Sequence, residues 1–176
     1  LVRTLPQGNV VVSPYSIWTA LGMAHAGANA TTAQEMAKVL HAPNNNAFFA
    51  QHTAQLHQIL GLPQDKRVQL HSANRLWVQE DLGLKPTFIT TLQKQFHSSV
   101  GRVNFREQAE PARATINQWV AQQTGQHIQE LMPRDSIGQH TALVLANALY
   151  MKAPWTFAFP PDSTRAEAFQ LDRQRS

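Results

Sequence analysis

Residues 9–16 read NVVVSPYS, and this short stretch changes abruptly from one backbone preference to another. The three valines at 10–12 favour a β-strand, whereas the serine and proline that follow favour the start of a helix. Ser13 precedes a proline, which biases it towards an extended backbone, and its hydroxyl suits the N-cap position. Pro14 then occupies the first helical position, where its missing N–H costs nothing. We therefore expect a strand at 10–12 and a helix at 15–26.

The rest of the chain alternates between helical and strand-like patterns. The helix at 15–26 is apolar nearly all round, which is typical of a buried helix, and Gly27 suits the position just after its end. Thr32 and Glu35 have the spacing of a capping box, which predicts the start of a second helix. The remaining predictions are helices at 48–60, from Pro86 onward and from Glu110 to near Gly125, and strands at 68–79, 100–105, 142–151 and 166–171. Because strands and helices mix without regular βαβ order, the pattern favours an α+β fold.

The stretch ALVLANALYM at 142–151 is apolar at both strand parities, which predicts a strand covered on both faces. Asn147 lies in its middle. A buried amide without a hydrogen-bond partner costs about 1–3 kcal/mol, so we expect this side chain to be paired. Two interpretations follow from the residues alone. Asn147 is either an ordinary satisfied core amide or a polar group that locks the strand in place.

The composition indicates one globular domain. The chain has 176 residues, of which 43% are hydrophobic and 15% charged, and no apolar run reaches the ~18 residues of a transmembrane helix. The formal net charge is +4, but the basic residues form neither a basic face nor a recognisable motif. We therefore expect neither nucleic acid nor a membrane as a partner. Cysteine is absent, which excludes disulfides and cysteine-ligated zinc.

The sequence contains no motif of a familiar catalytic type. The eight histidines include no H-E-x-x-H pair, no serine lies in a G-x-S-x-G element, and no glycine-rich phosphate loop occurs. We therefore expect that the protein is not an enzyme and uses no metal and no cofactor. Asn29-Ala30-Thr31 is an N-glycosylation sequon, which makes Asn29 a possible modification site, although such short sequons are common by chance.

Several separated motifs resemble the serpin family. NVVVSPYSIWTALGMAHAGA resembles the family's strand-to-helix entry, and TTAQEMAKVL resembles the helix after it. VQLHSANRLWVQ and GRVNF resemble the first two strands of the central sheet, and INQWVAQQTGQHIQELMP resembles the helix that lies across it. LVLANALYMKAPWTFAF resembles the third strand and its exit, except that Ala153-Pro154 replaces the usual glycine and polar residue. The resemblance covers nearly the whole chain in the family's order.

This resemblance implies a partial serpin fold, of the α+β class, in which helices pack on a central mixed β-sheet. A serpin is about twice as long as this chain. We therefore expect residues 1–176 to be the N-terminal part of a single serpin domain, without its C-terminal half and its reactive loop. The residues that the resemblance places in the shutter, beneath the centre of the sheet, are Asn9, Ser13, Ser16 and Asn147, and the residue that it places at the breach, where insertion begins, is Trp155.

Serpins inhibit serine proteases, and some cysteine proteases, by a conformational change in which the cleaved reactive loop inserts into the main sheet. The resemblance therefore implies a serine-type endopeptidase inhibitor whose partners are a target protease and the C-terminal remainder of the domain. It implies a secreted or extracellular location, or the periplasm in a bacterium, with the cytoplasm as the alternative. Two other functions stay open: a non-inhibitory serpin that acts as a carrier or chaperone, and an unrelated, complete α+β binding domain.

Overall fold

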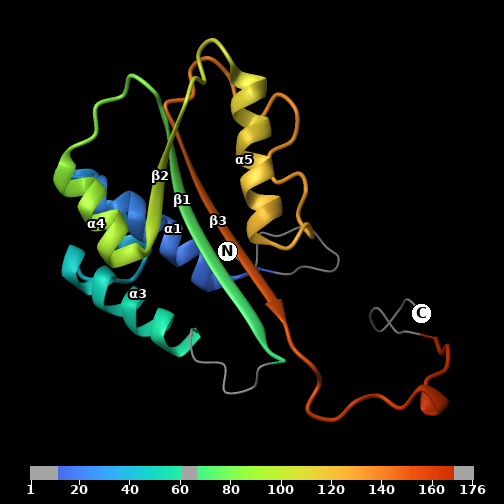
Figure 1. Ribbon diagram of the computed structural model, residues 1–176. Coiled ribbons are helices and arrows are strands. Elements are labelled where there is room, and N and C mark those ends of the chain that lie inside the picture. Colours follow the sequence, from blue (N-terminus) through green and yellow to red (C-terminus); the bar gives the residue numbers. More distant parts are fainter. Residues whose placement is uncertain (1–11, 61–66, 169–176) are drawn as a thin grey trace.

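The computed structural model of the protein describes residues 12–60 and 67–168, and Figure 1 shows helices packed around a small sheet. The helices are α1 (Pro14–Gly27), α2 (Ala30–Val39), α3 (Asn46–Leu60), α4 (Pro86–Phe96) and α5 (Ala109–Gln123). The strands are β1 (Gln69–Gln79), β2 (Ser98–Val103) and β3 (Leu143–Lys152), and a short 3-10 turn follows at Pro161–Ser163. The mixture of helices and strands confirms the α+β class.

The strand β1 lies at the centre of the sheet, whose order is β2-β1-β3. It pairs in parallel with β2, from Asn74 opposite Ser98 to Gln79 opposite Val103. The connection between these two strands passes through α4, which is the helical crossover that parallel strands need. β1 pairs antiparallel with β3, and Asn74 lies opposite Asn147 in this register. The sheet is therefore mixed, as expected.

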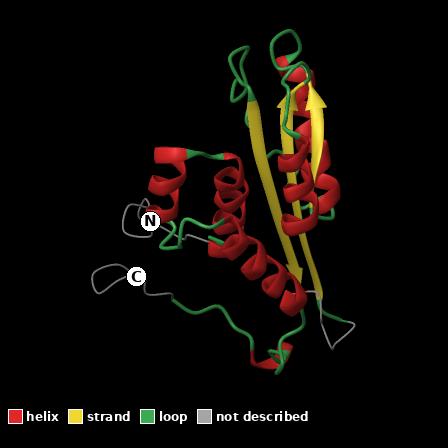
Figure 2. Ribbon diagram, turned by 90° about the vertical axis from the view of Figure 1, so that its left-hand side faces the viewer, coloured by secondary structure: helices red, strands yellow, loops and turns green. Residues whose placement is uncertain are grey.

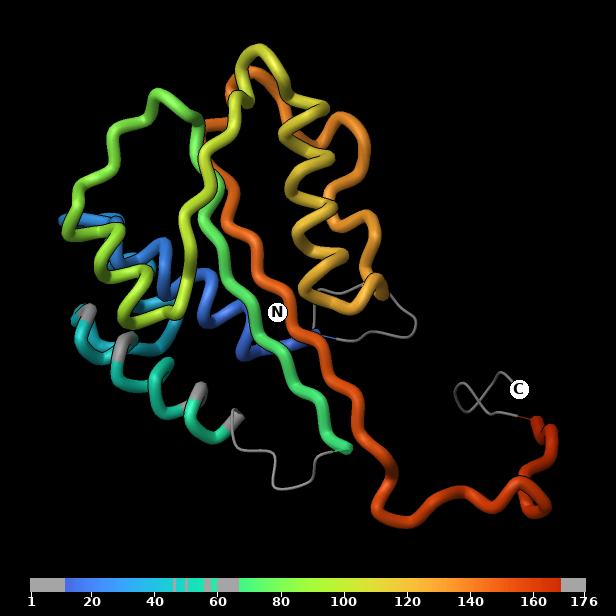
Figure 3. The backbone as a smooth tube through the Cα atoms, in the orientation of Figure 1, coloured from blue at the N-terminus to red at the C-terminus, as the bar shows by residue number. Residues whose placement is uncertain are grey.

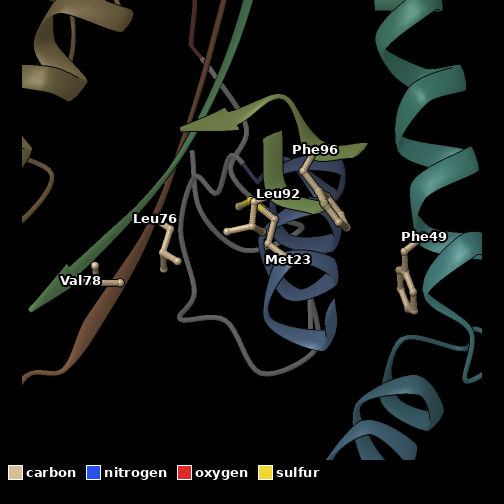
Figure 4. Close-up of a cluster of buried hydrophobic side chains, with 6 residues drawn as sticks. All are labelled: Met23, Phe49, Leu76, Val78, Leu92 and Phe96. Atoms are coloured by element: carbon tan, nitrogen blue, oxygen red, sulfur yellow. The ribbon is translucent and has the colours of Figure 1, made fainter. Parts of the chain in front are cut away.

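Each face of the sheet has its own hydrophobic core, because alternate side chains of β1 point to opposite sides. Trp77 faces α5 and meets Trp119 edge-on, with ring centroids 6.2 Å apart. Leu76 and Val78 face the other side, in one cluster with residues of α1 and α4. Helices lie on both sides of the sheet (Figure 1, Figure 2). The buried residues on the α1 side, drawn in Figure 4, are Met23, Phe49, Leu76, Val78, Leu92 and Phe96. Those on the α5 side are Trp77, Phe105, Ala112, Ile116, Ile137 and Ala146.

Two predicted helix ends are wrong. The second helix begins at Ala30, ahead of the expected capping box, because Asn29 takes the N-cap position and its carbonyl oxygen already accepts from the N–H of Ala33 at 3.4 Å. Gly27 is the last residue of α1, whereas the sequence places it beyond the helix. The glycine serves packing here, because a Cβ atom at this position would lie only 3.1 Å from Cε2 of the Phe88 ring.

The strand predictions also need correction. β2 begins at Ser98, two residues earlier than expected, because His97 ends α4 with a left-handed φ of 48° and turns the chain at once. Residues 166–168 do not form the predicted strand, since they pair with no strand in the described chain. Residues 169–171 lie outside the described chain. The strand expected at 10–12 also lies outside it, apart from Val12, which is not in a strand.

The prediction that residues 142–151 are covered on both faces is correct only for the centre of β3. Ala146 and Ala148 are 2% and 4% exposed, whereas Leu143 and Met151 near the two ends are 50% and 68% exposed. α1 and α5 pack against the strand from opposite sides, but no described element covers its ends. The apolar pattern therefore marks a strand with exposed apolar ends.

Candidate functional site

Ser13 and Ser16 lie at the start of α1. Ser13 is extended, with φ −106° and ψ 101°, and its Oγ accepts a hydrogen bond from the N–H of Ser16 at 3.2 Å. The Ser16 hydroxyl also donates to Ser13 Oγ, at 2.9 Å. Pro14 occupies the first helical turn, where its missing N–H leaves no gap in the hydrogen bonding. The predicted N-cap is confirmed, and the two hydroxyls are partners of each other.

A polar contact joins the start of α1 to the central strand. Ser72 Oγ in β1 donates to the hydroxyl oxygen of Tyr15 at 3.4 Å. Ser72 and Asn74 share one strand parity, so both side chains face the α1 side of the sheet. The polar part of β1 therefore lies over the first turn of α1.

Asn147 in β3 is paired with Asn74 in β1. The Nδ2 of Asn147 donates to Asn74 Oδ1 at 2.6 Å, and the two residues are direct register partners. Asn74 is only 4% exposed, and its Nδ2 donates to the carbonyl oxygen of Phe96, the last residue of α4, at 3.3 Å. The expectation that the Asn147 amide is hydrogen-bonded is therefore confirmed. The pair links β3, β1 and the end of α4.

The sequence reasoning did not select Asn74. The residue interrupts the alternating apolar positions of its strand, between Leu70 and Leu76, at a parity that faces the core. A lone amide at such a position needs a partner, because an unsatisfied buried amide is costly. That signal marks Asn74 as paired, but only the strand register identifies Asn147 as its partner.

The structure does not join the serine pair to the asparagine pair. Within residues 12–60 and 67–168, no hydrogen bond connects Ser13 or Ser16 with Asn147. Asn9 lies outside the described residues. What the geometry offers is a set of short side chains at the sheet–helix boundary. Hydroxyl and amide groups of this kind can exchange hydrogen-bond partners when the packed elements move.

The outer edge of β3 is open in the part of the chain that the structure describes. β3 pairs with β1 along one edge, and no described strand pairs with the other. The centre of the strand is buried between α1 and α5, so the open edge lies in a covered sheet. An unpaired edge presents a row of N–H and C=O groups that can accept another strand.

The segment after β3 is exposed. Figure 3 shows residues 153–168 leaving the sheet as an extended tail. Trp155 is 74% exposed and meets Phe159 edge-on at a centroid distance of 5.6 Å. Asn29, the candidate glycosylation residue, is exposed at the N-cap of α2, and its side chain makes no capping hydrogen bond. Among the described residues, no hydrogen bond joins Trp155 or Asn29 to the serine or asparagine pairs, and their predicted roles stay predictions.

Arg113 ties the segment that follows α5 to that helix. Arg113 in α5 donates from Nε to Glu110 at 2.9 Å and from a terminal guanidinium nitrogen to Glu130 at 3.1 Å. The hydrogen bond with Glu110 is the largest cause that raises the pKa of Arg113.

Among the described residues, no group of three or more metal-ligating side chains occurs. None of the described helices has the length and apolar character needed to cross a bilayer.

Comparison with known proteins identifies the family. The family model described as "Serpin (serine protease inhibitor)" matches residues 1–176. Ipis-1 of Ixodes persulcatus is 36% identical over 169 residues, which is 96% of this chain and 44% of that protein. A leukocyte elastase inhibitor of Xenopus tropicalis is 35% identical, with 95% of this chain and 44% of the relative covered.

Solved structures agree with this assignment. The structure "Cleaved Serpin 42Da" matches with a TM-score of 0.82 and 36% identity, over 97% of this chain and 45% of that one. Ovalbumin from emu matches with a TM-score of 0.83 and 26% identity, over 94% and 46%. The chain thus spans less than half the length of these relatives. Its sequence and its partial fold together show that the chain belongs to the serpin family.

Proposed function

We propose that this chain belongs to an inhibitor of serine-type endopeptidases that traps its target by adding a strand to the main sheet. The observation that carries the proposal is the outer edge of β3, which no described strand pairs, in a sheet covered on both sides at its centre. Every second residue of an added strand bonds to this edge through its backbone, and each such hydrogen bond is worth about 0.5–1.5 kcal/mol net. Strand addition of this kind is a known form of peptide recognition.

The polar pairs support the same proposal. In it, Ser13, Ser16 and Asn147 act in the shutter, together with Asn74, and let β1 and β3 shift over α1 while their side chains keep or exchange partners. Trp155 takes its breach role only when further chain covers it. That chain is the C-terminal remainder of the domain, which carries the reactive loop, and the partner is a serine or cysteine protease.

A covalent-adduct assay tests this function. The reading frame that contains the chain is expressed at its full length and incubated with elastase-like, chymotrypsin-like and trypsin-like proteases. The relatives named leukocyte elastase inhibitor place elastase-like enzymes first in that panel. We expect an adduct between inhibitor and protease that survives denaturant on a gel. The same protease with its active-site serine chemically blocked is the matched control and forms no adduct.

Cleavage of the loop without an adduct for every protease in the panel would contradict inhibition. That outcome would favour a non-inhibitory serpin, in which the sheet does not accept the loop. The thermal midpoint separates the two cases further. Insertion adds a strand to the sheet, so the cleaved inhibitor unfolds at a higher temperature than the intact one, whereas a cleaved non-inhibitory serpin does not.

A further inference from the structure

A groove of about 510 Å³ lies between the segment that follows α5 and the last residues of β3. His127 and Ile128 line it from the segment, and Tyr150, Met151 and Lys152 line it from the strand. Ile128 is 38% exposed and Met151 is 68% exposed, so the groove presents apolar surface to solvent. It lies at the end of the same strand whose outer edge is open.

Stacked rings hold one wall of this groove. The His127 ring lies nearly parallel to that of Tyr150, at 11° and a centroid distance of 5.3 Å. Tyr150 also stacks with His71 of β1, its register partner, at 26° and 5.9 Å. The rings therefore connect β1, β3 and the segment after α5 in one stack. Such contacts place His127 beside the strand end.

The rest of that segment is tied to α5. Asn117 donates from Nδ2 to the carbonyl oxygen of Met132 at 2.9 Å, and its Oδ1 accepts from the N–H of Met132 at 2.8 Å. The ion pair between Arg113 and Glu130 lies in the same region. Because both ties lie just beyond the groove, its outer wall is a fixed part of the fold.

Lys152 is the one charged residue among the described residues that line the groove. Lys152 is exposed, and no described residue forms an ion pair with it. The lining contains an imidazole and an ammonium group, and no described carboxylate belongs to it. The complementary ligand is therefore an anionic group on a short apolar stem, since Ile128 supplies an apolar contact beside Lys152.

The position of the groove identifies which strand residue reaches it. Tyr150 and Lys152 share the parity of Ala146 and Ala148, so the four side chains face the α5 side of the sheet. A strand added to the open edge places every second side chain on that side. We propose that the groove receives an aspartate or glutamate of the added strand, and that the pairing with Lys152 sets the register of insertion. This inference rests on the proposed strand addition and adds the charge and place of one side chain.

A peptide-scanning experiment tests the proposal. The probes are acetylated peptides of about eight residues, a typical strand length, with alternating valine and threonine and one glutamate that is moved along the sequence. Matched peptides carry glutamine in its place. We expect one position, near one end of the peptide, where glutamate binds about two- to fivefold more tightly than glutamine, as partly exposed ion pairs allow. The preference decreases at 1 M salt, where the Debye length is only about 3 Å.

Two variants make the test specific. Lys152→Gln removes the preference for glutamate but leaves the binding of the glutamine peptide unchanged. Lys94→Gln, which removes an exposed charge on α4, leaves both unchanged. If glutamate and glutamine bind equally at every position, the groove proposal is overturned while strand addition stands. If neither peptide binds at any position, the open edge does not accept a strand, and both proposals are contradicted.

Discussion

Two polar pairs lie on the same side of this sheet, and they differ in how far apart their members are in the sequence. Ser13 and Ser16 are three residues apart and bond within one helical turn. Asn74 and Asn147 are 73 residues apart and meet only because β1 and β3 pair in one register. The first pair stabilises an element, whereas the second fixes how elements are arranged. Substitutions in the asparagine pair therefore test the arrangement of the strands more directly than substitutions in the serine pair.

The largest effect is expected from Asn74→Ala. The substitution leaves the carbonyl oxygen of Phe96 and the Nδ2 of Asn147 without their partner. Because each unsatisfied buried group costs about 1–3 kcal/mol, we expect a loss of roughly 2–4 kcal/mol in the free energy of unfolding, measured by urea titration. Ser99→Ala, at an exposed position of β2, is the control and changes little. A loss below about 0.5 kcal/mol would mean that the asparagine pair does not hold the strands.

Asn147→Ala has a smaller expected effect. Asn147 is only half-buried, and its loss leaves one acceptor, Asn74 Oδ1, unsatisfied. We expect a loss of about 1–2 kcal/mol. The double substitution of both asparagines should cost clearly less than the sum of the single ones, because their bond is lost only once. Strict additivity of the two losses would show that the bond contributes nothing.

The two polar pairs differ in how much of each can be predicted from the sequence. The helix start at Ser13 depends on neighbours within one turn, so its chemistry is visible in NVVVSPYS. The need for a partner at Asn147 is visible too, because a lone amide in an apolar strand must be satisfied. The identity of that partner depends on strand register, which no local pattern specifies. For this reason Asn74 was missed.

The wrong predictions of burial and of one helix start also come from patterns that are local in the sequence. The pattern at 142–151 predicts burial, but burial depends on what else packs there, and Leu143 and Met151 are exposed. The capping box at Thr32 is a sound local signal, yet the chain enters the helix earlier, at Ala30. The fold class, the strand predicted at 68–79 and the order of the elements were predictable because they follow from long motifs.

Ser13→Ala tests the serine pair, whose two members lie within one helical turn. It removes the acceptor for the Ser16 N–H and hydroxyl. An N-cap substitution of this kind costs about 0.5–2 kcal/mol, which a thermal melt detects. Since no hydrogen bond joins Ser13 to Asn147 in the described chain, the losses from Ser13→Ala and Asn147→Ala should add. A coupling above about 0.5 kcal/mol would show that the two pairs form one network.

The smallest effect is expected from Trp155→Ala in the chain of residues 1–176. Trp155 is 74% exposed, so its removal should change the free energy of unfolding by less than about 0.5 kcal/mol. If the domain continues beyond Ser176, as proposed, the same substitution in the full-length protein should cost more, because a covered indole contributes packing. Equal effects at both lengths would contradict the proposed place of Trp155 at a covered breach.

The most direct test of strand addition is amide hydrogen exchange in β3 of the full-length protein, measured before and after it meets its protease. About half of the strand's amides point away from β1, as expected for alternating antiparallel hydrogen bonds. If a strand adds to the open edge, these amides become protected in the adduct while those bonded to β1 stay unchanged. Unchanged exchange along the whole of β3, in a preparation that has formed the adduct, would contradict insertion at this edge.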